Sequence, residues 1–179
     1  RAVVLTGRGK AFSAGGDFKW FPQLRDMARL EALRRDAKQL IWDLLDVELP
    51  IVAAVNGHAM GLGASIALLC DVIFMADTAT IGDPHVKVGI VAGDGGVAIW
   101  PLALGPARAK QYLMTGDPVS AAEAERIGLV NRVVPAAALL DDKQRPALLE
   151  ATEKDYAALR ERHAQKHERP MLPLEKARA

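Results

Sequence analysis

Two glycines, Gly61 and Gly63, lie in a short loop between an apolar run at 51–55 and a second apolar stretch at 64–69. This pattern is typical of a buried strand, a glycine turn and a helix. Glycine lets a ligand come close to the main chain, and the first turn of a helix presents N–H groups that have no helical partner. The stretch is therefore suited to holding negative charge on an oxygen atom.

A second glycine turn, Gly15-Gly16, follows the apolar run at 2–5, which predicts a buried parallel strand. Two adjacent glycines do not suit the interior of a regular element, so the backbone there either adopts special angles or lies against a ligand. Lys10 and Lys19 flank the turn. An ordinary surface loop explains these residues equally well.

The composition limits the class of protein. The chain has 179 residues, 50% hydrophobic content and a net charge of +1, which allows one real core and indicates no surface for nucleic acid. The single cysteine, Cys70, offers neither a disulfide nor a metal site. No apolar run approaches the length of a membrane span and no signal peptide is seen, so we expect a cytoplasmic protein without membrane contact.

The remaining pattern predicts alternating strands and helices, which favours an α/β fold with a largely parallel sheet. The expected elements are an amphipathic helix within 22–48, a strand at 72–75, a loop-rich region after Asp77 with a short helix near 97–104, a helix at 106–114, a helix opened by a capping box at 120–123, and a last strand ending at 134. We expect a core over 1–140 and a charged helical arm over 141–179.

Six motifs in order carry a family resemblance: AFSAGGD, AVNGHAMGLGAS, CDVIFMAD, TATIGDPHVKVG, AGDGG and SAAEAERIGLVNRVV. Together they resemble the enoyl-CoA hydratase/isomerase (crotonase) superfamily from Ala2 to about Val134. The resemblance implies the crotonase (ClpP-like) spiral of ββα units, here with a mostly helical C-terminal arm. It also implies a homotrimer or homohexamer. We expect the first strands of the family to precede Arg1.

The resemblance further implies an acyl-CoA thioester substrate, with no cofactor apart from the CoA of the substrate and no metal. The backbone N–H groups of Gly16 and Leu62 would form an oxyanion hole for the thioester enolate. Ala14 and Phe18 would lie along the adenine and pantetheine. Lys10 and Lys19 would face the CoA phosphates. Both lysines could equally be solvated surface charges.

The family's hydratases use two glutamates to hold and activate water, and these positions are Ser65 and His85 in this sequence. The standard hydration mechanism is therefore in doubt. A hydroxyl and an imidazole could position a water molecule or form a nucleophile–base pair. Ser65 could equally be a small residue at a helix start, and His85 a turn residue bonded to a carbonyl.

Asp94 is the third catalytic candidate, because some members of the superfamily carry a catalytic aspartate in this loop. The position of that aspartate aligns with Gly93, one residue before Asp94. Asp94 could instead cap the next helix, which we favour slightly. We interpret Asp83 as an exposed turn-forming residue and Asp17 as a residue that orients the oxyanion loop.

Three functions remain open. The first is a lyase or isomerase of fatty acid metabolism that acts on a CoA thioester. The second is a hydrolase that uses Ser65 and His85 on a CoA thioester or a β-diketone. The third is an acyl-CoA-binding homologue without hydratase activity. The acyl chain that such a protein accepts is not readable from the sequence.

Overall fold

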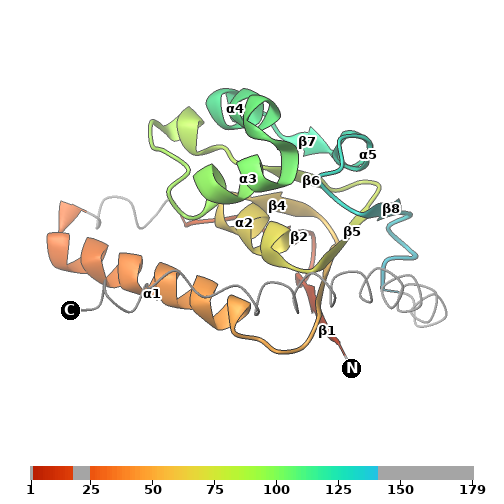
Figure 1. The fold of residues 1–179 in the computed structure, drawn as a ribbon, viewed down its shortest axis with the longest axis horizontal. Helices are drawn as coiled ribbons and strands as arrows, with labels where there is room; N and C mark the ends of the chain where they lie inside the picture. Colours follow the sequence, from red (N-terminus) through yellow and green to blue (C-terminus); the bar gives the residue numbers. More distant parts are fainter. Residues whose placement is uncertain (1, 18–24, 141–179) are drawn as a thin grey trace, which may run out of the picture. The chain divides into compact units, whose positions relative to one another are not determined.

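The computed structural model describes residues 2–17 and 25–140, and Figure 1 shows how their helices and strands are arranged. Phe18 and Lys19, which are two of the predicted CoA contacts, lie outside the described residues, as does the arm predicted over 141–179. The described part is an α/β structure built on two sheets, as the alternating sequence patterns predict.

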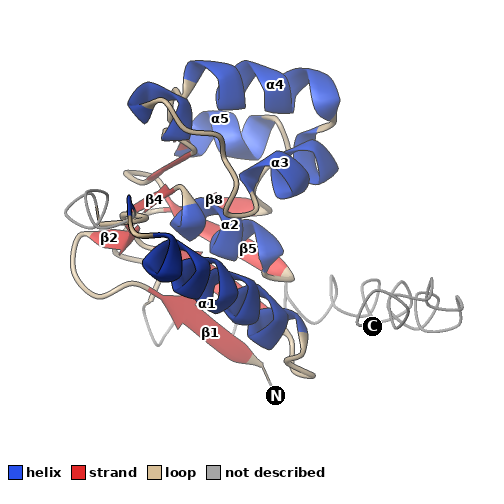
Figure 2. Ribbon diagram, turned by 90° about the vertical axis from the view of Figure 1, so that its left-hand side faces the viewer, coloured by secondary structure: helices blue, strands red, loops and turns tan. Residues whose placement is uncertain are grey.

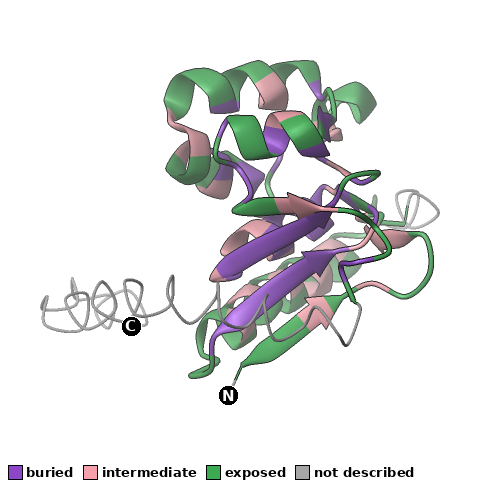
Figure 3. Ribbon diagram, turned by 90° about the vertical axis from the view of Figure 1, so that its right-hand side faces the viewer, coloured by how far each residue is buried: buried purple, intermediate pink, exposed green. Residues whose placement is uncertain are grey.

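Four parallel strands form the first sheet, in the order β1 (Val3–Thr6), β3 (Ile51–Val55), β5 (Val72–Ala76) and β8 (Arg132–Val134). Every residue of β3 and β5 is buried. A continuous apolar sequence is what a parallel strand covered on both faces requires. Figure 3 shows two neighbouring strands that are buried along their whole length at the centre of this sheet. The predicted strands on either side of the glycine loop are confirmed.

The burial predicted for the first strand is wrong. β1 is parallel to β3, but among the described strands it lies at the edge of the sheet, and Val3 and Val4 are 38% and 47% exposed. In Figure 3 the exposed strand next to the N-terminus is this edge of the sheet. An edge strand has a neighbour on one side only, so its apolar composition does not by itself bury it.

The second sheet consists of short strands that the sequence does not predict. Its order is β2 (Ala11–Ser13), β4 (His58–Met60), β6 (Thr80–Gly82) and β7 (Val119–Ser120), and only the last pair is antiparallel. Strands of two or three residues are too short to show a periodic pattern. This sheet matters for the site because β4 and β6 end directly before the residues that form it.

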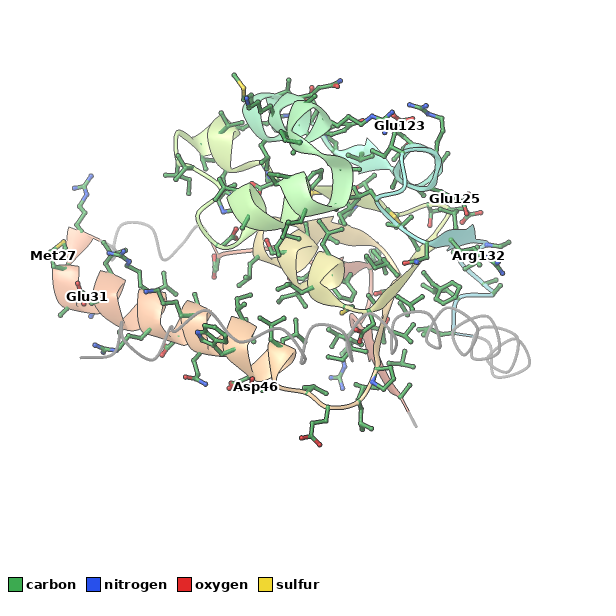
Figure 4. All side chains as sticks on the ribbon, in the orientation of Figure 1. Met27, Glu31, Asp46, Glu123, Glu125 and Arg132 are labelled. Carbon is green, nitrogen blue, oxygen red and sulfur yellow. The ribbon has the colours of Figure 1, made fainter. Side chains whose placement is uncertain are left out.

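The helices are α1 (Met27–Leu45), α2 (Leu62–Leu69), the single-turn 3-10 helix η2 (His85–Val88), α3 (Gly96–Leu104), α4 (Pro106–Thr115) and α5 (Ala121–Arg126). The predicted helix start at Ser120 is confirmed, because the Ser120 hydroxyl accepts the N–H of Glu123 at 3.3 Å. Glu125 of α5 accepts the N–H of Val133 at 2.8 Å, and Figure 4 shows Glu125 near Arg132 where α5 meets β8.

α2 contacts both α3 and α1. In Figure 2 α1 lies alongside the strands of the first sheet, whereas α3, α4 and α5 lie together at the other side of α2. α1 is amphipathic, as predicted, but has no fully buried residue. Among the described residues, no helix combines the length and the apolar composition needed to cross a membrane.

Candidate active site

Two glycines let the loop after β2 contact the start of α2. A Cβ atom added to Gly15 would lie 2.7 Å from the carbonyl oxygen of Met60, and a Cβ added to Gly63 would lie 2.5 Å from Cβ of Ser13. Gly15 also has a φ of 84°, which residues with a side chain rarely adopt. Larger residues would push the two segments apart, so the glycines allow their backbones to meet.

The predicted oxyanion donors, Gly16 and Leu62, belong to these two segments. Leu62 is the first residue of α2, and its N–H therefore has no partner within the helix. Gly16 is exposed, and apart from its chain neighbours no atom of the described residues lies within 4 Å of the position that its Cβ would take. A Cβ at Gly15 would lie 3.9 Å from Cα of Gly61. Gly16 follows Gly15 and Leu62 follows Gly61 in the chain, so the two predicted donors lie in the same region. Their role as an oxyanion hole stays a prediction.

His85 begins η2, and its ring is anchored by Asp83. Nδ1 of His85 is hydrogen-bonded to Oδ1 of Asp83, and the same oxygen accepts the backbone N–H of His85 at 3.3 Å. Asp83 is only 1% exposed, so its prediction as an exposed turn residue is wrong. It is buried because Gly96, the first residue of α3, packs directly on its carboxylate.

The other ring nitrogen of His85 faces Asp94, which lies in the loop before α3. Nε2 of His85 is 3.3 Å from Oδ2 of Asp94. A Cβ added to Gly61 would lie 3.1 Å from Cε1 of His85 and 3.6 Å from Oδ2 of Asp94. The imidazole–carboxylate pair therefore lies beside Gly61, the residue that precedes Leu62. Two groups that can carry protons therefore lie next to the start of α2.

Ser65 is fully buried in the first turn of α2. Its hydroxyl has no hydrogen-bond partner among the described residues, and a Cβ added to Gly95 would lie 3.3 Å from Oγ. Both ring nitrogens of His85 contact carboxylates. A Ser65–His85 nucleophile–base pair would therefore need a different orientation of the imidazole, and that pair stays a prediction.

The surroundings shift the pKa values of both members of the pair. The hydrogen bond with Asp83 is the main cause that raises the pKa of His85; burial opposes it, and the charge of Asp94 adds to it. Burial raises the pKa of Asp94, although the charge of His85 opposes this shift. Asp94 is thus a stronger base than an exposed aspartate, and His85 holds its proton more firmly than an exposed histidine.

Several buried polar atoms around the start of α3 have no partner among the described residues. They are Oγ of Ser65, Oδ2 of Asp83, Oδ1 of Asp94 and Nε1 of Trp100. Gly95 packs on Ser65 and Gly96 packs on Asp83, while Trp100 lies one turn further along α3. Because buried polar groups are normally hydrogen-bonded, this region is suited to polar atoms of a ligand or to ordered water.

Asp83, His85 and Asp94 also have the donor types of a metal site, and their ligand atoms lie within 4.8 Å of one another. A metal ion binds a histidine through one nitrogen. Here the two carboxylates contact different nitrogens of the ring. The arrangement is therefore better suited to moving protons than to surrounding one ion.

The structure thus brings His85 and Asp94 together, and it adds Asp83, which sequence reasoning did not select. The signal that could have found it is its position two residues before His85, because an aspartate at a turn commonly accepts the N–H two residues further on. Of the predicted CoA contacts, Lys10 and Ala14 are exposed beside β2.

Comparison with known proteins gives a consistent result. The sequence profile of the enoyl-CoA hydratase/isomerase family matches residues 1–177. A probable enoyl-CoA hydratase of Mycobacterium bovis is 42% identical over 146 residues, which are 82% of this chain and 56% of that protein. A crotonyl-CoA hydratase of Syntrophomonas wolfei is 40% identical over 148 residues, which are 81% of this chain and 56% of that protein.

A solved structure agrees with these sequence relatives. The crystal structure of subunit I of an enoyl-CoA hydratase from Geobacillus kaustophilus has a TM-score of 0.77 and 40% identity, and the match covers 96% of this chain and 66% of that chain. This likeness confirms the fold that the motifs predict. The chain spans only about half the length of the sequence relatives described above.

Proposed function

Since the chain belongs to the enoyl-CoA hydratase/isomerase family, we propose that it acts on an acyl-CoA thioester as a lyase or isomerase. The N–H groups of Gly16 and Leu62 hold the thioester oxygen while negative charge develops on it. His85 and Asp94 move the proton at the acyl carbon. Preorganised donors of this kind are often the largest single contribution to catalysis.

One observation carries the proposal: the 3.3 Å contact between Nε2 of His85 and Oδ2 of Asp94, beside the glycine that precedes Leu62. In isomerisation, a base removes a proton from the α carbon to form the enolate, and an acid returns a proton to the γ carbon. In hydration, the base takes a proton from water as the water oxygen bonds to the β carbon, and the acid protonates the α carbon of the enolate. An acid and a base within reach of an oxyanion donor can do both.

The two groups differ in their suitability for these roles. Burial raises the pKa of Asp94 and makes it the better base. His85, with its pKa raised chiefly by the hydrogen bond with Asp83, is the proton donor. This assignment replaces the two glutamates of the standard hydratase with one aspartate from another loop and one histidine. Ser65, at the position of the other glutamate, is left to position a polar atom.

No contact favours the alternative of a hydrolase based on Ser65 and His85. Among the described residues the Ser65 hydroxyl has no hydrogen-bond partner, and Nδ1 of His85 bonds to Asp83 instead. We further propose that CoA belongs to the substrate, with no separate cofactor, and that Lys10 faces its phosphates. A cytoplasmic homotrimer or homohexamer is the assembly that we propose from the family resemblance.

The test is turnover of short- and medium-chain trans-2-enoyl-CoA and trans-3-enoyl-CoA by the purified full-length protein, with CoA binding measured on the same sample. The variant is His85→Gln and the matched control is Asp117→Asn, which removes an exposed charge that pairs with Lys87. We expect a 3-hydroxyacyl-CoA or a shifted double bond as product. We expect His85→Gln to lower kcat by about 10²–10⁴-fold.

Each result has a distinct meaning. Binding with turnover that is lost in His85→Gln but kept in Asp117→Asn supports the proposal. Release of free CoA points to thioester hydrolysis instead. Binding without any turnover would leave an acyl-CoA-binding homologue, and absence of CoA binding would overturn the proposal.

A further inference from the structure

Asp83 enters the proposed chemistry only through its hydrogen bond with His85. Its carboxylate is 1% exposed, yet its Oδ1 atom faces two donors of one residue, Nδ1 and the backbone N–H of His85. A buried carboxylate is costly unless such partners compensate for its lost hydration. The contact with His85 therefore provides the main compensation for burying Asp83.

The rest of the carboxylate lies against the start of α3. A Cβ atom added to Gly96 would overlap Oδ2 of Asp83 and would lie 2.8 Å from Cβ of Ala92. Only glycine lets α3 begin this close to the carboxylate. On the other side, Gly61 borders Cε1 of His85, so the imidazole lies between a glycine backbone and a fixed carboxylate.

We propose that Asp83 is a positioning residue: it holds the proton on Nδ1 of His85, so that the proton which the charged ring gives up is the one on Nε2, which faces Asp94 and the acyl group. This inference rests on the site proposed above, but it concerns a property of His85 that exists without substrate. The physical reason is that both nitrogens of the charged ring face carboxylates, but Asp83 is 1% exposed whereas Asp94 is 20% exposed. The proton lost when the ring becomes neutral is therefore the one on Nε2, the nitrogen on the more open side.

The charged groups that act on His85 among the described residues are Asp83 and Asp94. The helix that packs against this turn, α4, leads to Gly116, which faces Val86 and Lys87 rather than the imidazole. Lys87 itself pairs with Asp117 at 3.0 Å. The state of the ring therefore depends on the two aspartates.

The test is nitrogen-15 NMR of the full-length protein with labelled histidine, followed across a pH series. The chain has four histidines, and the spectrum of His85→Gln identifies the signal of His85. In the unmodified protein we expect His85 to titrate above the ordinary histidine pKa and to show the Nδ1–H tautomer when neutral. A neutral Nε2–H tautomer would overturn the proposal without any variant.

The variant is Asp83→Asn, which keeps the size of the side chain and removes its charge. We expect the pKa of His85 to fall, because its main raising partner is lost, and kcat to fall while KM stays unchanged. Asp117→Asn is the matched control and should move neither. His58, whose Nδ1 contacts the hydroxyl of Thr80 at 2.7 Å, is the internal control.

Failure of this inference differs from failure of the proposed function. If the tautomer and the pKa of His85 follow Asp83 but no acyl-CoA is turned over, the positioning role holds and the proposed function fails. If turnover depends on His85 while Asp83→Asn leaves its titration unchanged, the positioning role is wrong. Should Asp83→Asn not fold, the tautomer in the unmodified protein still decides.

Discussion

Nε2 of His85 and Oδ2 of Asp94 lie 3.3 Å apart, although the two residues belong to different segments, η2 and the loop before α3. Neither side chain is fully buried, since they are 19% and 20% exposed. The pair is thus accessible to a ligand but still shielded enough for burial to raise the pKa of Asp94. This combination is typical of groups that transfer protons to a substrate.

The first prediction concerns Asp94. Replacing it with asparagine keeps the shape of the side chain but removes the base, so we expect kcat for the acyl-CoA substrate to fall by about 10²–10⁴-fold. Steady-state kinetics with the same enoyl-CoA thioesters measures this effect. Asp117→Asn serves as the control with the same change of charge. Unchanged kcat in Asp94→Asn would assign the aspartate to structure alone.

The second prediction concerns Ser65. Its buried hydroxyl has no partner among the described residues, so Ser65→Ala removes a group whose desolvation is not compensated. We expect the free energy of unfolding to stay within about 0.5 kcal/mol or to rise. We also expect kcat to change by only a few fold. Urea unfolding and steady-state kinetics measure the two effects, and a collapse of turnover would favour the hydrolase with a serine nucleophile.

The third prediction concerns Gly96. A methyl group there would overlap the Asp83 carboxylate, so Gly96→Ala should lower the free energy of unfolding by about 1–3 kcal/mol. It should also lower kcat, because Asp83 must move. Gly93→Ala is the control in the same loop, since among the described residues other than its chain neighbours its added Cβ would meet no atom closer than 3.8 Å. Equal urea midpoints for the two variants would contradict the packing argument.

The fourth prediction concerns pH. The hydrogen bond with Asp83 is the main cause that raises the pKa of His85 above its ordinary value of 6.5, so the folded state binds this proton more tightly than the unfolded state. The resulting stabilisation is fully present below pH 6.5 and is lost as the pH rises through the raised value. Burial also raises the pKa of Asp94, so this proton too is bound more tightly in the folded state. The resulting stabilisation is fully present below pH 3.8 and is lost as the pH rises through the raised pKa of Asp94.

Urea unfolding in a series of buffers, from below pH 6.5 to well above neutrality, tests this prediction. The free energy of unfolding of the unmodified protein should decrease across the window that begins at pH 6.5, and His85→Gln should remove that part of the decrease. If the two proteins show the same dependence on pH, the histidine does not gain its partner on folding.

The sequence by itself determined the central strands, the helix starts and the family. The short apolar runs that became β3 and β5 are bounded by turn residues and favour buried strands, and Ser120 with Glu123 predicts its own helix cap, because these signals act over a few neighbouring residues. The glycines that separate the central strands also predict an anion-binding helix start. Ordered motifs then identified the superfamily, which the profile match confirms.

Only the tertiary structure decided which side chains meet. The exposure of Val3 follows from the position of β1 at the sheet edge, and the burial of Asp83 follows from the packing of Gly96 on it. The contact between His85 and Asp94 likewise joins two segments that have no common local pattern. Such contacts depend on how helices and strands pack over long separations, and no short-range signal in the chain encodes that packing.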